Sequence, residues 1–214
     1  MPSNKTILKL ISWIGLFCIQ IFFSIYIQST LFKILILSTY MIVTSILWIK
    51  RIEKRSLRDR LDLHLKNFQF LIYALVLSII ILYARNNFVA ASLLFGGSIL
   101  LPIFEELFFR CYLLGSMISD WPNFYSLPRE DRSSFIKKAT PPLLLTSLAF
   151  ALVHNDVVSL IINGNIGFML FALIIIRIMF GWAVGGIYIL QKNISIPSIF
   201  HIIFNISYYI FNPG

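Results

Sequence analysis

The sequence predicts an all-α protein, a polytopic bundle of about seven transmembrane helices. Hydrophobic residues make up 58% of the 214 residues, and charged residues only 13%. Apolar runs of about 20 residues, the length that crosses a hydrocarbon core of roughly 30 Å, recur along the chain. The basic residues gather between these runs and do not spread over a soluble face. Together these observations describe a bilayer-embedded bundle.

The apolar runs follow one another with no soluble domain between them. We therefore expect a single integral membrane domain over residues 1–214, with its polar motifs in a core of about residues 89–212. The first run has no small-residue cleavage site after it, so it resembles a retained anchor. The expected spans are residues 7–27, 31–49, 68–84, 89–114, 141–162, 166–190 and 196–212.

Two polar segments separate these spans. Residues 50–67 place leucines at helical spacing among mixed charges, which fits either a helix lying along the lipid headgroups or a solvated loop. Residues 119–142 contain four prolines and no sustained period. This pattern predicts a cytoplasmic loop, with the next helix starting near Thr140.

The basic residues also predict the topology. Although the net charge is +9, 14 of the 18 basic residues fall on one side of a seven-span arrangement. By the positive-inside rule this side is cytoplasmic. We therefore expect a multi-pass protein of the cell membrane with a cytoplasmic N-terminus, and we expect it to have the bilayer, but no nucleic acid, as a partner.

Two further features mark the sixth span, residues 166–190. Gly181 and Gly185 are four residues apart, a spacing that lets another helix pack closely. Arg177 lies near the middle of the span, where a charge is costly. It is expected to pair with another buried charge, such as Glu106, or to meet a carboxylate of a substrate.

The stretch LPIFEELFFRCYLL places three charges inside the fourth span. An ionised residue at the centre of a membrane helix costs roughly 2.5–3.5 kcal/mol, so such residues usually face the bundle interior and mark a site. Glu106 and Arg110 are four residues apart, share a helix face and can form an ion pair. Glu105 points about 100° away and has no partner on its own helix, which suits a general base.

Two other spans carry polar residues. His154 follows Phe150 by one helical turn, so the two rings can pack together. His201 and Asn205 are four residues apart and project from one face of the last span. We expect these groups to meet Glu105 and to activate a water molecule for attack on an amide carbonyl, with His201 and Asn205 stabilising the oxyanion. No metal and no cofactor is needed for this chemistry.

These residues resemble a known family. EELFFR matches the motif EExxxR, FALVH the motif FxxxH and HIIFN the motif HxxxN of the CAAX protease and bacteriocin-processing family of intramembrane glutamic endopeptidases. The resemblance implies that Glu105 is the general base, that His154 assists it, that His201 and Asn205 form the oxyanion site and that Glu106 and Arg110 support them. It also implies a peptide or protein substrate, including a membrane-associated or lipidated one.

Two alternatives stay open at this point. A zinc peptidase could use Glu105, His154 and His201 as ligands, although the sequence contains no HExxH motif. A protein without enzymatic activity, acting in bacteriocin immunity or proton-coupled transport, could use the same carboxylates and histidines as a relay.

Overall fold

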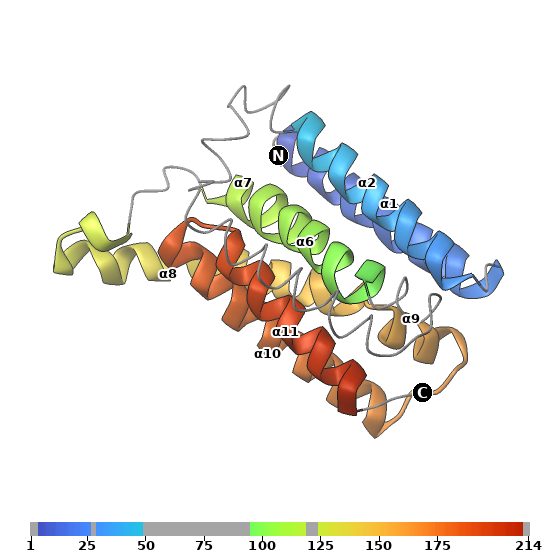
Figure 1. Cartoon of the computed structure of the whole chain (residues 1–214). Coiled ribbons are helices and arrows are strands. Elements are labelled where there is room, and N and C mark those ends of the chain that lie inside the picture. Colours follow the sequence, from blue (N-terminus) through green and yellow to red (C-terminus); the bar gives the residue numbers. More distant parts are fainter. Residues whose placement is uncertain (1–3, 27–28, 49–94, 119–123, 212–214) are drawn as a thin grey trace. The chain divides into compact units, whose positions relative to one another are not determined.

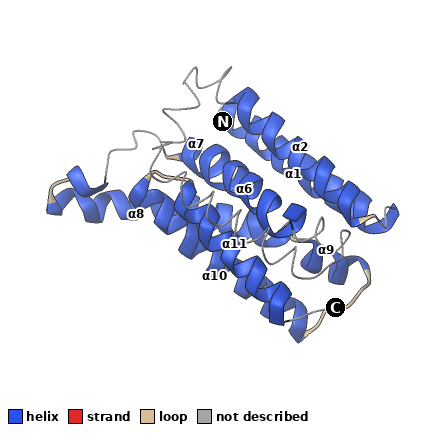
Figure 2. Ribbon diagram, viewed as in Figure 1, coloured by secondary structure: helices blue, strands red, loops and turns tan. Residues whose placement is uncertain are grey.

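The computed structural model describes residues 4–26, 29–48, 95–118 and 124–211, and every regular element in these ranges is helical (Figure 2). The predicted all-α class is confirmed for this part of the chain. Wider, π-type turns at Gly96–Leu100 and Leu107–Leu114 flank α6. The α-helices, labelled in Figure 1, are α1 (Asn4–Tyr26), α2 (Thr30–Leu47), α6 (Leu101–Glu106), α7 (Gly115–Met117), α8 (Arg129–Leu152), α9 (Asn155–Ile162), α10 (Phe168–Gln191) and α11 (Ser195–Phe211).

Six of the seven expected spans overlap these helices. The expected span 68–84 and the polar segment 50–67 lie outside the described residues. Within the described ranges, α10 is the one helix that is long and apolar enough to cross a membrane, and α8 with α9 passes the same test if the bent pair counts as one span. Shorter apolar stretches occur at Ile7–Phe23, Phe32–Leu47 and Ser195–Ser207. The number of membrane crossings therefore stays a prediction.

The helices pack into two compact units. The first contains α1, α8, α9 and α10, and the second contains α2, α6 and α11. The boundary falls inside the π-type turns after α6, between Tyr112 and Leu113. The division describes how the helices pack. The single integral membrane domain over residues 1–214 stays a prediction.

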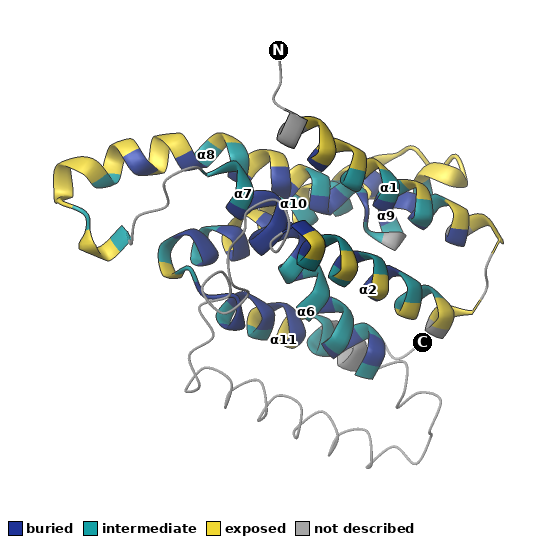
Figure 3. Ribbon diagram, turned by 90° about the horizontal axis from the view of Figure 1, so that it is seen from above, coloured by how far each residue is buried: buried dark blue, intermediate teal, exposed yellow. Residues whose placement is uncertain are grey.

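In the first unit, α8 begins much earlier than expected. The prediction of a loop up to Thr140 is wrong, because the helix starts at Arg129, directly after Pro128. Glu130 and Asp131 lie in its first turn, where negative charge interacts favourably with the helix dipole. Most residues in this half of α8 are exposed (Figure 3), so it lacks the apolar face by which a helix is usually recognised in a sequence.

The expected span 141–162 is two helices. α8 ends at Leu152, α9 begins at Asn155, and the helix directions differ by 62°. His154 lies between them with an extended backbone, at φ −66° and ψ 136°. The prediction of one span treated the polar residues His154, Asn155 and Asp156 as an interruption within an apolar run, whereas they mark the start of the second helix.

Side chains of α1 stabilise this break. A helix that ends leaves its last carbonyl groups without helical donors. Trp13 Nε1 donates to the carbonyl oxygen of Ala149 at 3.2 Å, and Gln20 Nε2 donates to that of Val153 at 3.0 Å. The N-terminal helix thus satisfies polar groups that the end of α8 exposes.

The expected close packing of α10 is found at Gly181. A Cβ atom at this position would lie 3.2 Å from both Cα and Cβ of Ser147 on α8, which is closer than ordinary contact. Gly181 and Gly185 are both buried. The small residue therefore allows α10 to approach the backbone of α8, as the small-xxx-small pattern predicts.

In the second unit, α6 packs against α2 and α11. Aromatic side chains of the π-type turns after α6 pack against α2 and the residue that follows it: the ring centroids of Tyr40 and Phe108 lie 6.5 Å apart, and those of Trp48 and Tyr112 lie 5.1 Å apart in an edge-to-face arrangement. Phe108 and Tyr112 have no exposed surface. This packing gives the polar residues on the same helix a rigid support.

Candidate active site

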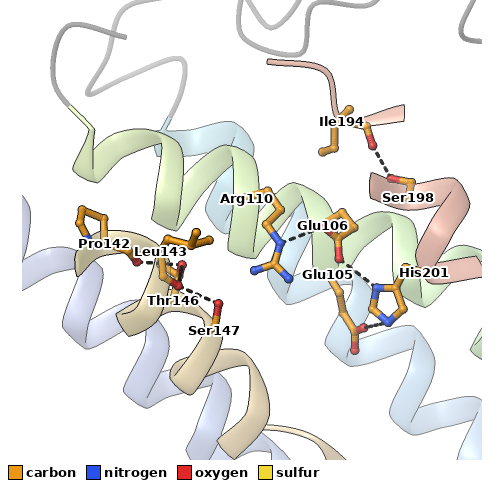
Figure 4. Close-up of polar contacts among 10 residues, drawn as sticks. All are labelled: Glu105, Glu106, Arg110, Pro142, Leu143, Thr146, Ser147, Ile194, Ser198 and His201. Carbon is orange, nitrogen blue, oxygen red and sulfur yellow. Dashed lines mark hydrogen bonds and ion pairs between the residues drawn. The ribbon is translucent and has the colours of Figure 1, made fainter. Parts of the chain in front are cut away.

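The ion pair expected on the fourth span is present. Arg110 Nε donates to Glu106 Oε2 at 3.0 Å, and neither side chain has exposed surface (Figure 4). Glu106 ends α6, and Arg110 lies in the π-type turns that follow. Such wide turns are often found at functional sites. The pair keeps two buried charges close to neutral as a whole.

His201 on α11 contacts both glutamates. Its Nδ1 lies 3.0 Å from Glu106 Oε1, and its Nε2 lies 3.4 Å from Glu105 Oε2 (Figure 4). The histidine is completely buried, whereas the Glu105 side chain is 14% exposed. The structure thus gives Glu105 a partner on α11.

These contacts form a chain from Arg110 through Glu106 and His201 to Glu105. Arg110 can only donate hydrogen bonds, so it holds Glu106 as an acceptor. Glu106 then accepts from Nδ1 of His201, which fixes the orientation of the imidazole ring. Nε2 faces Glu105 Oε2 at 3.4 Å. The arrangement suits a group that takes up and returns a proton.

Asn205 lies one helical turn beyond His201 on α11 and is partly exposed. The regular helix keeps the two residues four apart on one face, as the spacing predicts. Its role in stabilising an oxyanion stays a prediction.

His154 belongs to the first unit, at the break between α8 and α9. Its ring centroid lies 4.3 Å from that of Phe150, so the expected ring packing is confirmed although His154 itself is outside the helix. Nδ1 lies 3.0 Å from the carbonyl oxygen of Phe150. A carbonyl oxygen only accepts hydrogen bonds, so Nδ1 carries the proton and, in the neutral ring, Nε2 carries the lone pair of a base.

Arg177 pairs with a residue that the sequence analysis did not consider. Its Nη2 lies 2.8 Å from Asp156 Oδ2, so Arg177 pairs with another charge as expected, but the partner is the partly exposed Asp156 and not Glu106. Asp156 is the only acidic residue within the expected span 141–162. An isolated acid in one apolar run and an isolated arginine in the next were the signal that could have identified the pair.

Comparison with known protein families matches residues 87–207 to the family described as type II CAAX prenyl endopeptidase Rce1-like. The chain belongs to this family. The matched residues include all three motifs, from Glu105 to Asn205. Searches of curated proteins and of solved structures found no match.

Membership of the Rce1-like family confirms the resemblance seen in the motifs. It implies peptidase activity on a peptide or protein substrate, and proteins of this family are embedded in membranes.

Proposed function

We propose that the chain is a multi-pass intramembrane endopeptidase that hydrolyses peptide bonds with an activated water molecule and without a metal. Glu105 takes the proton of the water, with His154 as its partner. His201 and Asn205 stabilise the negative charge on the former carbonyl oxygen. Glu106 and Arg110 hold His201 in position.

The observation that carries this proposal is the contact chain Arg110–Glu106–His201–Glu105. If the ion pair had only a structural role, Glu106 and Arg110 would suffice, and no further polar partner would be needed. Here Glu106 also accepts from a buried histidine, and that histidine faces a second carboxylate that is partly exposed. A fixed imidazole next to a carboxylate that water can reach is the arrangement that proton transfer requires.

Two observations support a role for His154: its motif and the position of its ring proton. His154 is the histidine of FALVH, and the family resemblance implies that this histidine helps Glu105 to activate the water molecule. The hydrogen bond to Phe150 leaves the lone pair on Nε2 in the neutral ring, which is what a second base or acceptor needs.

The surface of α10 supports insertion in the bilayer. Seven large apolar side chains on this helix are exposed, which is unusual for a protein surface in water and normal for one in lipid. They are Phe168, Met169, Phe171, Ile175, Ile176, Met179 and Trp182. We propose that the other predicted spans cross the membrane with α10, that the N-terminus is cytoplasmic and that the substrate is a peptide delivered at or in the cell membrane.

The test is cleavage of a labelled, membrane-delivered peptide by the purified full-length protein. Glu105→Gln keeps the size of the side chain but cannot take up the proton, so we expect an inserted, folded and inactive protein. Glu130→Gln makes the same change at an exposed position of α8 and should cleave like the parent. Normal cleavage by Glu105→Gln would contradict the proposed mechanism.

The same assay distinguishes the proposed metal-free mechanism from that of a zinc peptidase. A catalytic zinc site has three protein ligands, of which the second unit offers Glu105 and His201. If 1,10-phenanthroline abolished cleavage and added zinc restored it, the metallopeptidase reading would replace the proposal. If the parent protein cleaved no peptide but still protected cells or moved protons, a function in immunity or transport would take its place.

A further inference from the structure

The position of the His154 ring depends on how α8 and α9 are joined. The imidazole contacts Phe150, on the α8 side of the break, in two ways: the two rings pack in a T-shaped arrangement, and Nδ1 lies 3.0 Å from the carbonyl oxygen of Phe150. The backbone of His154 is bound to both helices: its nitrogen donates to the carbonyl oxygen of Ala151 on α8 at 3.4 Å, and its carbonyl oxygen accepts from Val158 N at 2.9 Å, the first hydrogen bond of α9. A rotation of α9 relative to α8 would therefore move the imidazole.

Asp156 ties the start of α9 to α10. Its Oδ1 accepts from the backbone nitrogen of Val157 at 2.9 Å, which holds the carboxylate against the first turn of α9. Its Oδ2 lies 2.8 Å from Nη2 of Arg177 on α10. The Arg177 side chain is 17% exposed and that of Asp156 is 35% exposed, so solvent screens this pair less than an ion pair on an open surface.

Asp156 is two residues from His154 along the chain. Its contacts with Val157 and Arg177 hold the start of α9 next to the break at which His154 lies. One aspartate therefore fixes the helix whose first hydrogen bond ends on the His154 carbonyl oxygen.

We propose that Asp156 and Arg177 are positioning residues for His154, and that their ion pair holds the imidazole in its catalytic place at the break between α8 and α9. This inference rests on the proposed function, because it gives His154 a role in the reaction. Neither residue belongs to the three motifs, and neither touches the reacting atoms in this assignment.

The kinetic test uses Asp156→Asn, which can keep the hydrogen bond to Val157 but loses the charge. We expect kcat to fall roughly 10–100-fold with little change in KM, since residues that orient a functional group have effects of this size. Arg177→Gln should have a similar effect, and Arg177→Lys should retain more activity because it keeps the charge. Asp131→Asn, the same change at an exposed position of α8, should leave kcat unchanged.

A second measurement does not depend on turnover. The chain has only three histidines, so ¹⁵N-labelled histidine gives few ring signals, and the His154→Gln variant identifies those of His154. In the parent the His154 signals should report a proton on Nδ1, and Asp156→Asn should shift them. Unchanged ring signals in a folded Asp156→Asn variant would overturn the positioning role.

The outcomes separate this inference from the proposed function. If Glu105→Gln is inactive while Asp156→Asn and Arg177→Gln keep the parental kcat, the positioning role is wrong and the endopeptidase proposal stands. If Glu105→Gln cleaves like the parent, the proposed function is wrong. If Arg177→Lys loses as much activity as Arg177→Gln, charge pairing is not what positions His154, and the inference also fails.

Discussion

Replacing Glu106 by glutamine should separate stability from catalysis. The ion pair with Arg110 is 3.0 Å long and completely buried. At an effective dielectric constant of ~20, two unit charges at this distance attract by about 5–6 kcal/mol before the cost of removing them from solvent. Removing one partner of a buried pair typically destabilises a protein by roughly 3–5 kcal/mol, because the other charge stays buried. Glu106→Gln should therefore unfold more readily and also cleave more slowly.

The double variant Glu106→Gln/Arg110→Met tests the reason for this effect. It removes the unpaired cation, so most of the lost stability should return, as it does when buried ion pairs are replaced by apolar residues. Activity should stay low, since His201 Nδ1 no longer donates to a carboxylate that orients the ring, a loss of roughly 10–100-fold. Thermal denaturation in detergent and the peptide cleavage assay measure the two effects separately.

Glu130→Gln is the matched control, because it makes the same chemical change at an exposed site. Its effect on stability should lie within about 0.5 kcal/mol. If Glu106→Gln were as stable as the parent, the buried pair would not contribute as argued. If the double variant regained both stability and full activity, Glu106 would have no role in orienting His201.

Three further predictions concern other parts of the chain. Asn205→Ala should lower kcat by ~10²–10³ in the cleavage assay while the protein stays folded, since one oxyanion donor is lost and the base remains; an unchanged kcat would contradict the oxyanion role. Gly181→Leu should destabilise the first unit by roughly 1–3 kcal/mol in thermal denaturation, because its Cβ would lie 3.2 Å from Ser147. Gly186→Leu is the control and should be tolerated, because no atom lies within 4 Å of a Cβ at that position. A cysteine in place of Lys137 should react with a membrane-impermeant reagent only from the cytoplasmic side of sealed membranes, and labelling only from outside would reverse the topology.

Local spacing allowed the sequence to predict contacts between residues four apart in the chain. The pairing of Glu106 with Arg110 and the packing of Phe150 against His154 both follow from a separation of four residues. Contacts between helices were not accessible in this way. Glu106 and His201 are 95 residues apart, and no periodicity relates them. The ordered motifs indicated that these residues belong to one site, but they could not show that one imidazole contacts both glutamates.

Predictions of helix boundaries failed for a related reason. Hydrophobicity marks the part of a helix that faces lipid or core, so it did not reveal the charged first half of α8. The average hydrophobicity of the run also hid the end of α8 at Leu152, although the polar residues His154, Asn155 and Asp156 follow it directly and could have signalled a new helix start. The hydrogen bonds that Trp13 and Gln20 donate at this end come from residues distant in sequence.

The two hydrogen bonds from α1 have a consequence for any attempt to prepare a minimal enzyme. The residues that match the family begin at 87, so a shortened protein designed on that boundary would lack Trp13 and Gln20. The carbonyl groups of Ala149 and Val153 would then lose their donors, at a cost of about 1–3 kcal/mol for each polar group left buried without a partner. The loss would fall beside His154. We therefore expect a shortened protein with a competent His154 to need the N-terminal helix, although that helix carries none of the three motifs.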